Sequence, residues 1–567
     1  MSQALRPEPP IRVRLDLKAP MRDGVLLSTD LYRPAVGERF PALLLRTYYD
    51  NQNPLYVDWA GQFARAGYAV ALQDVRGRYD SDGVWRPYLD ETHDGHDTLT
   101  WVGQQPWCDG NVGTFGVSYN ALTATRPAPL RSPYLKAVMP LTGQEDNFGH
   151  VYCDGVLELW NAMNFLNLGT RTMQTGSRRF VDYEALFRRL PLVSALDDVV
   201  DRPTYREFIS HPTLDEYWLS YSLKGRYREI EAPAYVVTGW YDNLLHEGFK
   251  QFRGWREEAR TAEARARTKL LVGPWVHYNV QSGGGGPIRY GDLDFGATAL
   301  VDIPGLHRRW FDRRLRGIEN GIDGEAPLRL FVMGPNVWRD EWEWPLARTR
   351  WTDYYLHSGG RANSLHGDGT LSPARPEDEP TDTFAYDPDR PVPTLGGQIQ
   401  SPGDCGPRDR RPVERRDDVL VFTSAPLAED LEVTGPVVLT LHAASSAPDT
   451  DFTATLVDVD PTGPAMIVCE GIRRARYRES LELPSLIEPG RVYEYRVDLW
   501  ETSNVFRAGH RLRVEVSSSN FPRFDRNPNT GHPFGLDADR RIAHQTIYHD
   551  ARHPSRITLP IVPARAG

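Results

Sequence analysis

Three side chains of the types that cooperate in acyl transfer stand at the ends of apolar segments: Ser118, Asp242 and His277. Ser118 follows the extended run 110–115 and has Gly116 two positions before it. A serine hydroxyl becomes a good nucleophile only when a base removes its proton. A carboxylate that holds the imidazole base in one tautomer completes the set. The three residues are therefore candidates for nucleophile, orienting carboxylate and base, in that order.

The elements that would position these side chains are three strands of a parallel sheet. Asp242 follows the apolar run 234–238, His277 follows the run 269–272, and a helix-compatible segment comes after Ser118. Open α/β sheets place their ligand sites outside the carboxyl ends of such strands. The chain order Ser, Asp, His is that of α/β-hydrolases, in which the serine occupies a sharp strand-to-helix turn. The sequence therefore predicts a Ser-His-Asp triad.

Two features leave alternatives open at this site. The usual serine motif is G-x-S-x-G, whereas Asn120 stands at the second glycine position here. Asp242 also precedes a helical segment that starts near Leu244, where a carboxylate can act as an N-cap. Asp242 fulfils both roles only if its carboxylate turns toward His277.

Acyl transfer also needs hydrogen-bond donors directed at the oxyanion that develops on the acyl group. The turn at Ser118 supplies one donor, the backbone N–H of Tyr119. The second is expected from the loop after the apolar run 43–45, which contains Tyr48 and Tyr49. The residue types alone leave both tyrosines open.

The rest of the N-terminal half predicts a mostly parallel, doubly wound sheet. Dense apolar runs at 41–45, 68–72 and 135–139 suit central strands that are covered on both faces. The segment 56–66 has helical spacing, and the alternation within 11–33 predicts an antiparallel hairpin at one sheet edge. Strands that alternate with helices in this way indicate an α/β fold.

The pattern of apolar residues changes twice along the chain. We predict an α/β-hydrolase domain from residues 1–143 and 233–350, interrupted by a helical cap at 144–232, because apolar residues recur there at helical intervals. Short strands of period two then predict an all-β jelly-roll domain over 351–567. The Pro-, Asp- and Gly-rich segment 361–416 is expected to be a long connection that wraps the other domains and is anchored by Phe384 and Tyr386.

Composition narrows the classes of partner. The chain of 567 residues has 66 basic and 76 acidic side chains, a net charge of −10 that argues against nucleic-acid binding. The absence of a long apolar run argues against a membrane span. The four cysteines are far apart, and no metal or cofactor motif is present, so we expect no metal and no cofactor. We expect a cytoplasmic protein with a small-molecule partner, and a homo-oligomer stays open.

Several longer segments carry a resemblance to a known family. They are 46–50 (RTYYD), 73–83 (QDVRGRYDSDG), 116–119 (GVSY), 239–242 (GWYD), 273–277 (GPWVH), 332–338 (VMGPNVW), 449–454 (DTDFTA) and 469–477 (CEGIRRARY). Over nearly its whole length the chain resembles the cocaine esterase-like (CocE/NonD) hydrolases, which are grouped with X-Pro dipeptidyl peptidases and α-amino acid ester hydrolases. The resemblance implies the same three domains. It also implies an oxyanion hole in which the tyrosine before the Asp of R-x-x-Y-D, here Tyr49, assists the amide of Tyr119.

The chain departs from these relatives at two places. Family members usually carry S-Y-x-G at the elbow, where this chain has Ala121 in the glycine position. The α-amino acid ester hydrolases have acidic residues shortly after the triad aspartate, where they hold the ammonium group of the substrate. The corresponding segment 243–245 is Asn-Leu-Leu, which disfavours substrates with a free α-amine.

Together these features predict a serine hydrolase that cleaves carboxylic esters through an acyl-Ser118 intermediate. Tyr48, the cap residues Trp160 and Phe165, and Leu244 are predicted to line its apolar substrate pocket. A peptidase or amide acylase that resembles the X-Pro dipeptidyl peptidases would use the same triad and is the alternative. A non-catalytic protein that binds a glycan through its jelly roll is the alternative of another class.

Overall fold

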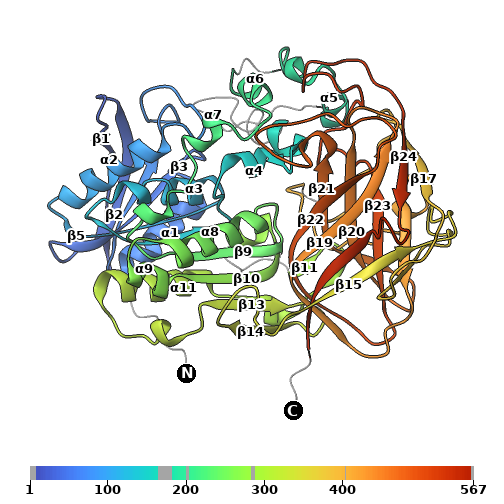
Figure 1. Ribbon diagram of the computed structural model, residues 1–567. Coiled ribbons are helices and arrows are strands. Elements are labelled where there is room, and N and C mark those ends of the chain that lie inside the picture. Colours follow the sequence, from blue (N-terminus) through green and yellow to red (C-terminus); the bar gives the residue numbers. More distant parts are fainter. Residues whose placement is uncertain (1–7, 164–181, 200–202, 282–287, 402–403, 564–567) are drawn as a thin grey trace.

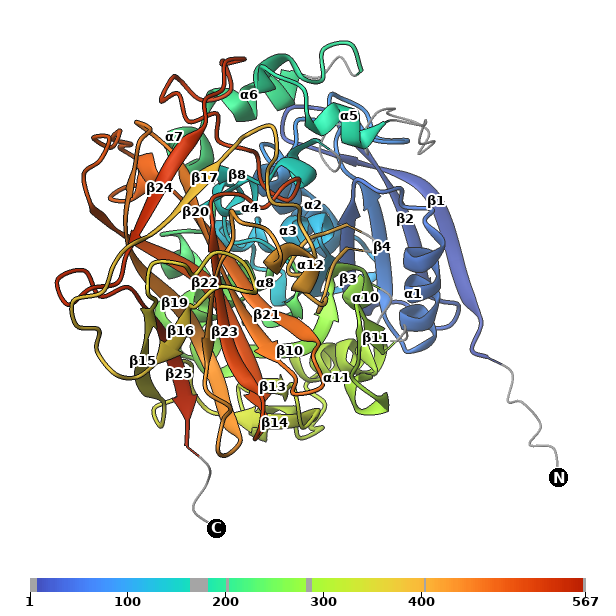
Figure 2. The same ribbon diagram turned by 90° about the vertical axis from the view of Figure 1, so that its right-hand side faces the viewer.

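The computed structural model describes residues 8–163, 182–199, 203–281, 288–401 and 404–563. In this part of the chain two large sheets lie side by side, and short helices lie above the place where the sheets meet (Figure 1). A view turned by 90° shows the same helices, α5 and α6, at the top of the molecule (Figure 2). Within the described residues, no helix combines the length and apolar character needed to cross a membrane.

The first sheet contains ten strands within the described residues, in the order β1-β2-β4-β3-β5-β6-β9-β10-β13-β14. They are β1 (Ile11–Pro20), β2 (Leu26–Pro34), β3 (Phe40–Thr47), β4 (Ala69–Asp74), β5 (Cys108–Val117), β6 (Leu135–Leu141), β9 (Tyr235–Tyr241), β10 (Lys269–Val276), β13 (Leu328–Val332) and β14 (Val337–Glu341). From β4 to β13 all neighbours pair in parallel, and β1, β2 and β14 add antiparallel edges. The predicted parallel sheet with an edge hairpin is confirmed.

Helices cover both faces of this sheet, as the doubly wound prediction requires. The longer ones are α1 (Pro54–Arg65), α2 (Glu91–Gln104), α8 (Leu245–Glu258) and α11 (Ile303–Arg316), and the short α3 (Tyr119–Thr125) follows β5. On one face Phe115 of β5 packs edge-on against Phe63 of α1 and contacts Phe311 of α11. On the other face the neighbouring Thr114 donates a hydrogen bond to the Ala124 carbonyl in α3 at 2.9 Å. Alternation along one strand therefore anchors helices on opposite sides.

In the residues that the structure describes, the regular elements between β6 and β9 are mostly short helices, as expected. The helices are α4 (Asn147–Val151), α5 (Tyr183–Phe187), α6 (Pro203–Ser210) and α7 (Glu216–Leu219). The segment also contains a small hairpin of β7 (Tyr152–Cys153) and β8 (Val156–Leu157), which the helical periodicity did not predict. The turn is Asp154-Gly155, with φ of +48° and +83°. Asp-Gly is a favoured pair for such a turn, because both central residues adopt positive φ.

The second sheet is formed by the C-terminal region, which is built mainly of strands. The predicted all-β fold class of this region is confirmed. Its strands are β15 (Arg350–His357), β16 (Thr370–Ser372), β17 (Asp382–Tyr386), β18 (Leu420–Ser424), β19 (Leu431–Ser445), β20 (Asp451–Val459), β21 (Ala465–Arg474), β22 (Tyr493–Phe506), β23 (Arg511–Ser517), β24 (Ala543–Tyr548) and β25 (Arg556–Val562). The predicted alternation is clear in β22, where Tyr495, Val497 and Leu499 are fully buried and Glu494 and Arg496 are exposed. The inward side chains form a core of their own.

Two expectations for this region are wrong. Strands β19 and β22 are 15 and 14 residues long rather than short, because β19 continues through an irregularity between Pro436 and Val438 and pairs with several neighbours. The segment 361–416 is also more than a connection, because it contributes β16 and β17 to the sheet. Phe384 and Tyr386 of β17 are buried, and this packing outweighs the turn-forming composition around them.

Buried charges hold the cap against the jelly roll. Arg523, which is 1 % exposed, contacts Glu158 of the cap at 3.3 Å and also pairs with Glu470 of β21. The Leu157 N–H donates to the Asp525 carboxylate at 2.9 Å, and the Asp525 N–H donates back to the Leu157 carbonyl. The interface therefore combines main-chain pairing with a buried ion-pair network.

We predict that Arg523→Met destabilises the fold by about 3–5 kcal/mol, because it leaves two carboxylates buried without their cation. The free energy of unfolding from urea denaturation measures this loss. The control is Arg507→Met, which removes a pair with Asp430 whose two side chains are 45 % and 48 % exposed. Little change is expected there, because solvent screens exposed pairs. Equal urea midpoints for the two variants would contradict the role of Arg523 as the cation that compensates the two buried carboxylates.

Candidate active site

Ser118 occupies the strained turn between β5 and α3. Its backbone has φ +60° and ψ −124°, and its N–H donates to the Leu141 carbonyl of β6 at 2.9 Å. A side chain at Gly116 would place its Cβ 2.3 Å from the Asn120 carbonyl oxygen. The turn can therefore close only with glycine at position 116. Such strain is found where a structure holds a functional group in a set orientation.

Asn120, the departure from the usual motif, lies in the first turn of α3. It is fully buried and is not among the residues with positive φ. Position 120 therefore does not need the conformational freedom of glycine. At the next position, the small side chain of Ala121 is also fully buried.

The structure brings Ser118, His277 and Asp242 into one hydrogen-bonded chain. Ser118 Oγ lies 3.0 Å from His277 Nε2, and His277 Nδ1 lies 3.0 Å from Asp242 Oδ1. Their exposed fractions are 4 %, 1 % and 0 %. The distances permit proton transfer from the hydroxyl to the imidazole, and the carboxylate faces the other ring nitrogen.

The carboxylate of Asp242 has two partners, but Asp242 is not the N-cap of α8, because Leu244 occupies that position. Its Oδ1 faces His277 and also accepts a hydrogen bond from the Leu244 N–H at 2.8 Å, just before α8 begins. The turn that starts α8 therefore orients the carboxylate toward the imidazole.

A second group of donors meets beside Ser118. The hydroxyl of Tyr49 hydrogen-bonds with the Ser118 side chain, with the Tyr119 backbone N–H and with the Tyr48 side chain. Burial raises the pKa of Tyr49, so the phenol keeps its proton at neutral pH and stays a donor. Of the two tyrosines left open by residue type, Tyr49 is the one that reaches Ser118.

Tyr48 packs against the rings of Tyr49, Trp85 and Tyr119. Its ring centroid is 4.1 Å from that of Tyr49, and its other side stacks on Trp85 at 5.5 Å with an interplanar angle of 5°. Only 3 % of Tyr48 is exposed. These contacts give Tyr48 a position that supports the Tyr49 ring.

A buried ion pair behind the elbow was missed by the sequence analysis. The Tyr119 hydroxyl donates to Glu91 at 2.9 Å, and Arg46 pairs with the other oxygen of Glu91 at 2.9 Å. Tyr119 follows the serine, and Arg46 is three residues before Tyr49, so Glu91 connects the two segments that carry the donors. No sequence signal identifies it, because an acidic residue in the first turn of a helix is common on dipole grounds alone.

The remaining residues predicted for a substrate pocket are not brought together. Leu244 is buried beside Asp242, whereas Trp160 lines a separate cavity of about 310 Å³ with Phe187 of the cap and Phe521 of the jelly roll. None of Ser118, Asp242 and His277 lines that cavity. Phe165 lies outside the described residues.

Among the residues that the structure describes, no group of three or more His, Cys, Asp or Glu side chains is arranged to hold a metal ion.

Comparisons with known proteins identify the family of the chain. Residues 23–279 match the X-Pro dipeptidyl-peptidase (S15) family, and residues 320–558 match the X-Pro dipeptidyl-peptidase C-terminal non-catalytic domain. A cocaine esterase from Rhodococcus sp. is 40 % identical, and the match covers 97 % of this chain and 98 % of the relative. A protein of Mycobacterium tuberculosis named as a serine esterase is 27 % identical over 96 % of this chain and 94 % of its own.

Solved structures show the same fold. An α-amino acid ester hydrolase superposes with a TM-score of 0.83 at 24 % identity, covering 99 % of this chain and 98 % of that one. An aminopeptidase from a marine sediment archaeon of the Thaumarchaeota gives 0.84 at 24 % identity, with the same coverage.

We predict that Gly116→Ala lowers the free energy of unfolding by about 1–3 kcal/mol or more, because the new methyl group overlaps the main chain of Asn120. Thermal and urea denaturation measure the loss. Gly324→Ala is the matched control, since a Cβ there would meet nothing within 4 Å and no positive φ is involved. If both variants unfold like the parent, the elbow is not packed as described.

Proposed function

Because the chain belongs to the cocaine esterase-like family of serine hydrolases, we propose that it hydrolyses carboxylic esters through an acyl intermediate on Ser118. The observation that carries this proposal is the hydrogen-bonded chain from Ser118 through His277 to Asp242, with both distances at 3.0 Å. Burial of all three side chains keeps bulk water away from the hydrogen bonds. The protected chain suits general base catalysis.

In the proposed mechanism, Ser118 Oγ attacks the ester carbonyl carbon while His277 Nε2 takes the hydroxyl proton. Asp242 holds the Nδ1–H and stabilises the imidazolium that forms. The tetrahedral intermediate collapses when His277 passes its proton to the alcohol oxygen, which leaves. A water molecule then attacks the acyl-serine with His277 again as base, and the acid is released as Ser118 regains its proton.

We propose that Tyr49 and the Tyr119 amide stabilise the oxyanion. The Tyr49 hydroxyl hydrogen-bonds with both the Ser118 side chain and the Tyr119 N–H, which supports a role for both donors beside the nucleophile. Because burial raises the pKa of Tyr49, its hydroxyl stays protonated and can donate to a developing negative charge.

We propose esters rather than peptides as substrates for a local reason. The positions after Asp242 are Asn243, Leu244 and Leu245, all buried and none of them acidic. His150, which interacts electrostatically with His277, is also uncharged at neutral pH because burial lowers its pKa to about 4. None of these four residues offers a carboxylate to the free α-amine of a substrate bound at Ser118. The esterase names of the relatives at 40 % and 27 % identity support the same choice.

We predict that the parent enzyme has higher kcat/KM on neutral aryl and alkyl esters than on X-Pro peptides or acyl amides. Ser118→Ala should abolish turnover of every substrate and labelling by a fluorophosphonate probe, because no other group takes the acyl chain. A steady-state panel of the three substrate classes, run beside probe labelling, measures both. Faster X-Pro cleavage would make the protein a peptidase with the same triad. Turnover by Ser118→Ala would remove Ser118 as the nucleophile.

We predict that Tyr49→Phe lowers kcat by about 10²–10³-fold with little change in KM, because the lost donor acts on the transition state. Tyr48→Phe is the matched variant, which removes a hydroxyl from the adjacent ring. It should lower kcat much less, because the Tyr48 hydroxyl hydrogen-bonds to Tyr49 and acts on the oxyanion only through it. A larger loss in Tyr48→Phe than in Tyr49→Phe would exchange the two roles. Steady-state kinetics on one activated ester suffice.

A further inference from the structure

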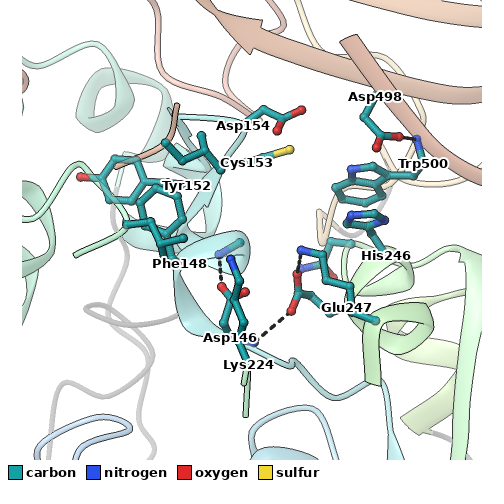
Figure 3. A pocket seen from close by; sticks show the side chains of 15 residues that line it. Asp146, Phe148, Tyr152, Cys153, Asp154, Lys224, His246, Glu247, Asp498 and Trp500 are labelled. Atoms are coloured by element: carbon teal, nitrogen blue, oxygen red, sulfur yellow. Dashed lines mark hydrogen bonds and ion pairs between the residues drawn. The ribbon is translucent and has the colours of Figure 1, made fainter. Parts of the chain in front are cut away.

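A small cavity lies where the α/β unit, the cap and the jelly roll meet (Figure 3). Its volume is about 90 Å³. Helix α8 contributes His246, Glu247 and Lys250, the cap contributes residues from the segment 146–154, and β22 contributes Asp498 and Trp500. Ser118, Asp242 and His277 do not line it, so it is separate from the proposed active site.

Aromatic rings form two opposite walls of this junction cavity. Figure 3 shows Phe148 and Tyr152 on one side and Trp500 with His246 on the other. Phe148 stacks on Tyr152 at 5.4 Å, and Trp500 stacks on His246 at 5.8 Å with an interplanar angle of 10°. The faces of Phe, Tyr and Trp rings are electron-rich and attract cations.

Acidic groups outnumber basic groups around the junction cavity. The four carboxylates are Asp146, Asp154, Glu247 and Asp498, and the two lysines are Lys224 and Lys250. Lys250 is 2.8 Å from Glu247 and compensates it. His246 Nδ1 lies 3.1 Å from the Glu501 carboxylate, which is not part of the lining. Glu501 therefore compensates a positive charge on His246. Arg473, outside the lining, lies 3.5 Å from Asp154, so three basic groups face the four carboxylates and a surplus of one negative charge remains.

Two polar side chains of the lining keep free hydrogen-bonding groups. Asn243 is 4 % exposed, and neither its Oδ1 nor its Nδ2 has a partner among the described residues. Asp154 has one carboxylate oxygen 3.5 Å from Arg473, whereas Oδ2 is buried without a partner in the described part of the chain. Buried polar atoms are rarely left unsatisfied, so these atoms indicate a ligand.

We propose that the junction cavity binds a small organic ammonium ion, such as an alkylamine of one to three carbons. An ammonium group has three donors and no acceptor, which matches the free oxygens of Asp154 and Asn243 but not the free Nδ2 donor of Asn243. Its alkyl part fits between the aromatic walls. The volume corresponds to roughly three water molecules, which sets the size of the ligand. A multidentate metal ion fits less well, because the described carboxylates and His246 do not form a three-ligand group.

Binding at this place would stabilise the docking of all three parts of the chain, since each part supplies lining residues. A ligand that binds the folded state and not the unfolded state raises the melting temperature by mass action. The prediction does not depend on the proposed ester hydrolysis, because its readout is stability and binding.

The test measures the melting temperature of the full-length protein in ethylammonium chloride, with sodium and potassium chloride at equal ionic strength as references. We expect a saturable rise of about 2 °C near 100 times Kd with ethylammonium, and no matching rise with either salt. Isothermal titration calorimetry with ethylammonium gives the Kd directly.

Asp154→Asn is the informative variant, because it removes the carboxyl group and keeps the shape. Residue 154 has φ +48°, which asparagine tolerates, so the variant should fold. We expect its Kd for ethylammonium to rise about tenfold or more. The control is Asp340→Asn on β14, a carboxylate that is 63 % exposed, whose Kd should equal that of the parent.

Three outcomes would overturn the assignment. An equal rise with potassium chloride would make the effect one of inorganic cations or ionic strength. An unchanged Kd in Asp154→Asn would place the amine elsewhere on the molecule. No heat of binding and no thermal shift with ethylammonium would show that the cavity does not take an ammonium ion.

Discussion

The parallel register of neighbouring strands is the constraint on which the site depends. Tyr241 at the end of β9 pairs with Val276 at the end of β10, so the next residues, Asp242 and His277, leave the sheet at the same level. On the other side, the Ser118 N–H bonds to the end of β6, which itself pairs with β9. A slip of one residue in any of these pairings would turn a side chain to the wrong face and break the hydrogen-bonded chain.

The second constraint is that a buried charge needs a partner. In several places the fold puts a side chain of opposite charge next to a buried one. Glu91 pairs with Arg46 and accepts from the Tyr119 hydroxyl beneath the elbow, while Arg523 pairs with two carboxylates between the cap and the jelly roll. An isolated buried charge is costly, so these partners must be in place when the parts dock. The jelly roll therefore helps to determine how the cap sits over the sheet.

The triad could be predicted from the sequence because the ends of core strands are visible as the ends of apolar runs. Apolar runs that finish in a serine, an aspartate and a histidine predicted the three residues that the structure joins. The residue types alone did not distinguish Tyr48 from Tyr49 as the oxyanion donor. The family resemblance favoured Tyr49. Strand β17 was missed because its buried Phe384 and Tyr386 lie among turn-forming residues, and their packing partners are far away in the chain.

The sequence by itself therefore determined the order of elements, the fold class and the chemical types at the strand ends, since these follow from periodicity and short-range steric preferences. Only the tertiary structure decided that Tyr49 reaches Ser118, that Glu91 ties both donor segments together, and that a charged cavity forms at the three-part junction. Each of these depends on contacts between residues distant in the chain. Such contacts are set by the packing of whole elements, which local pattern does not encode.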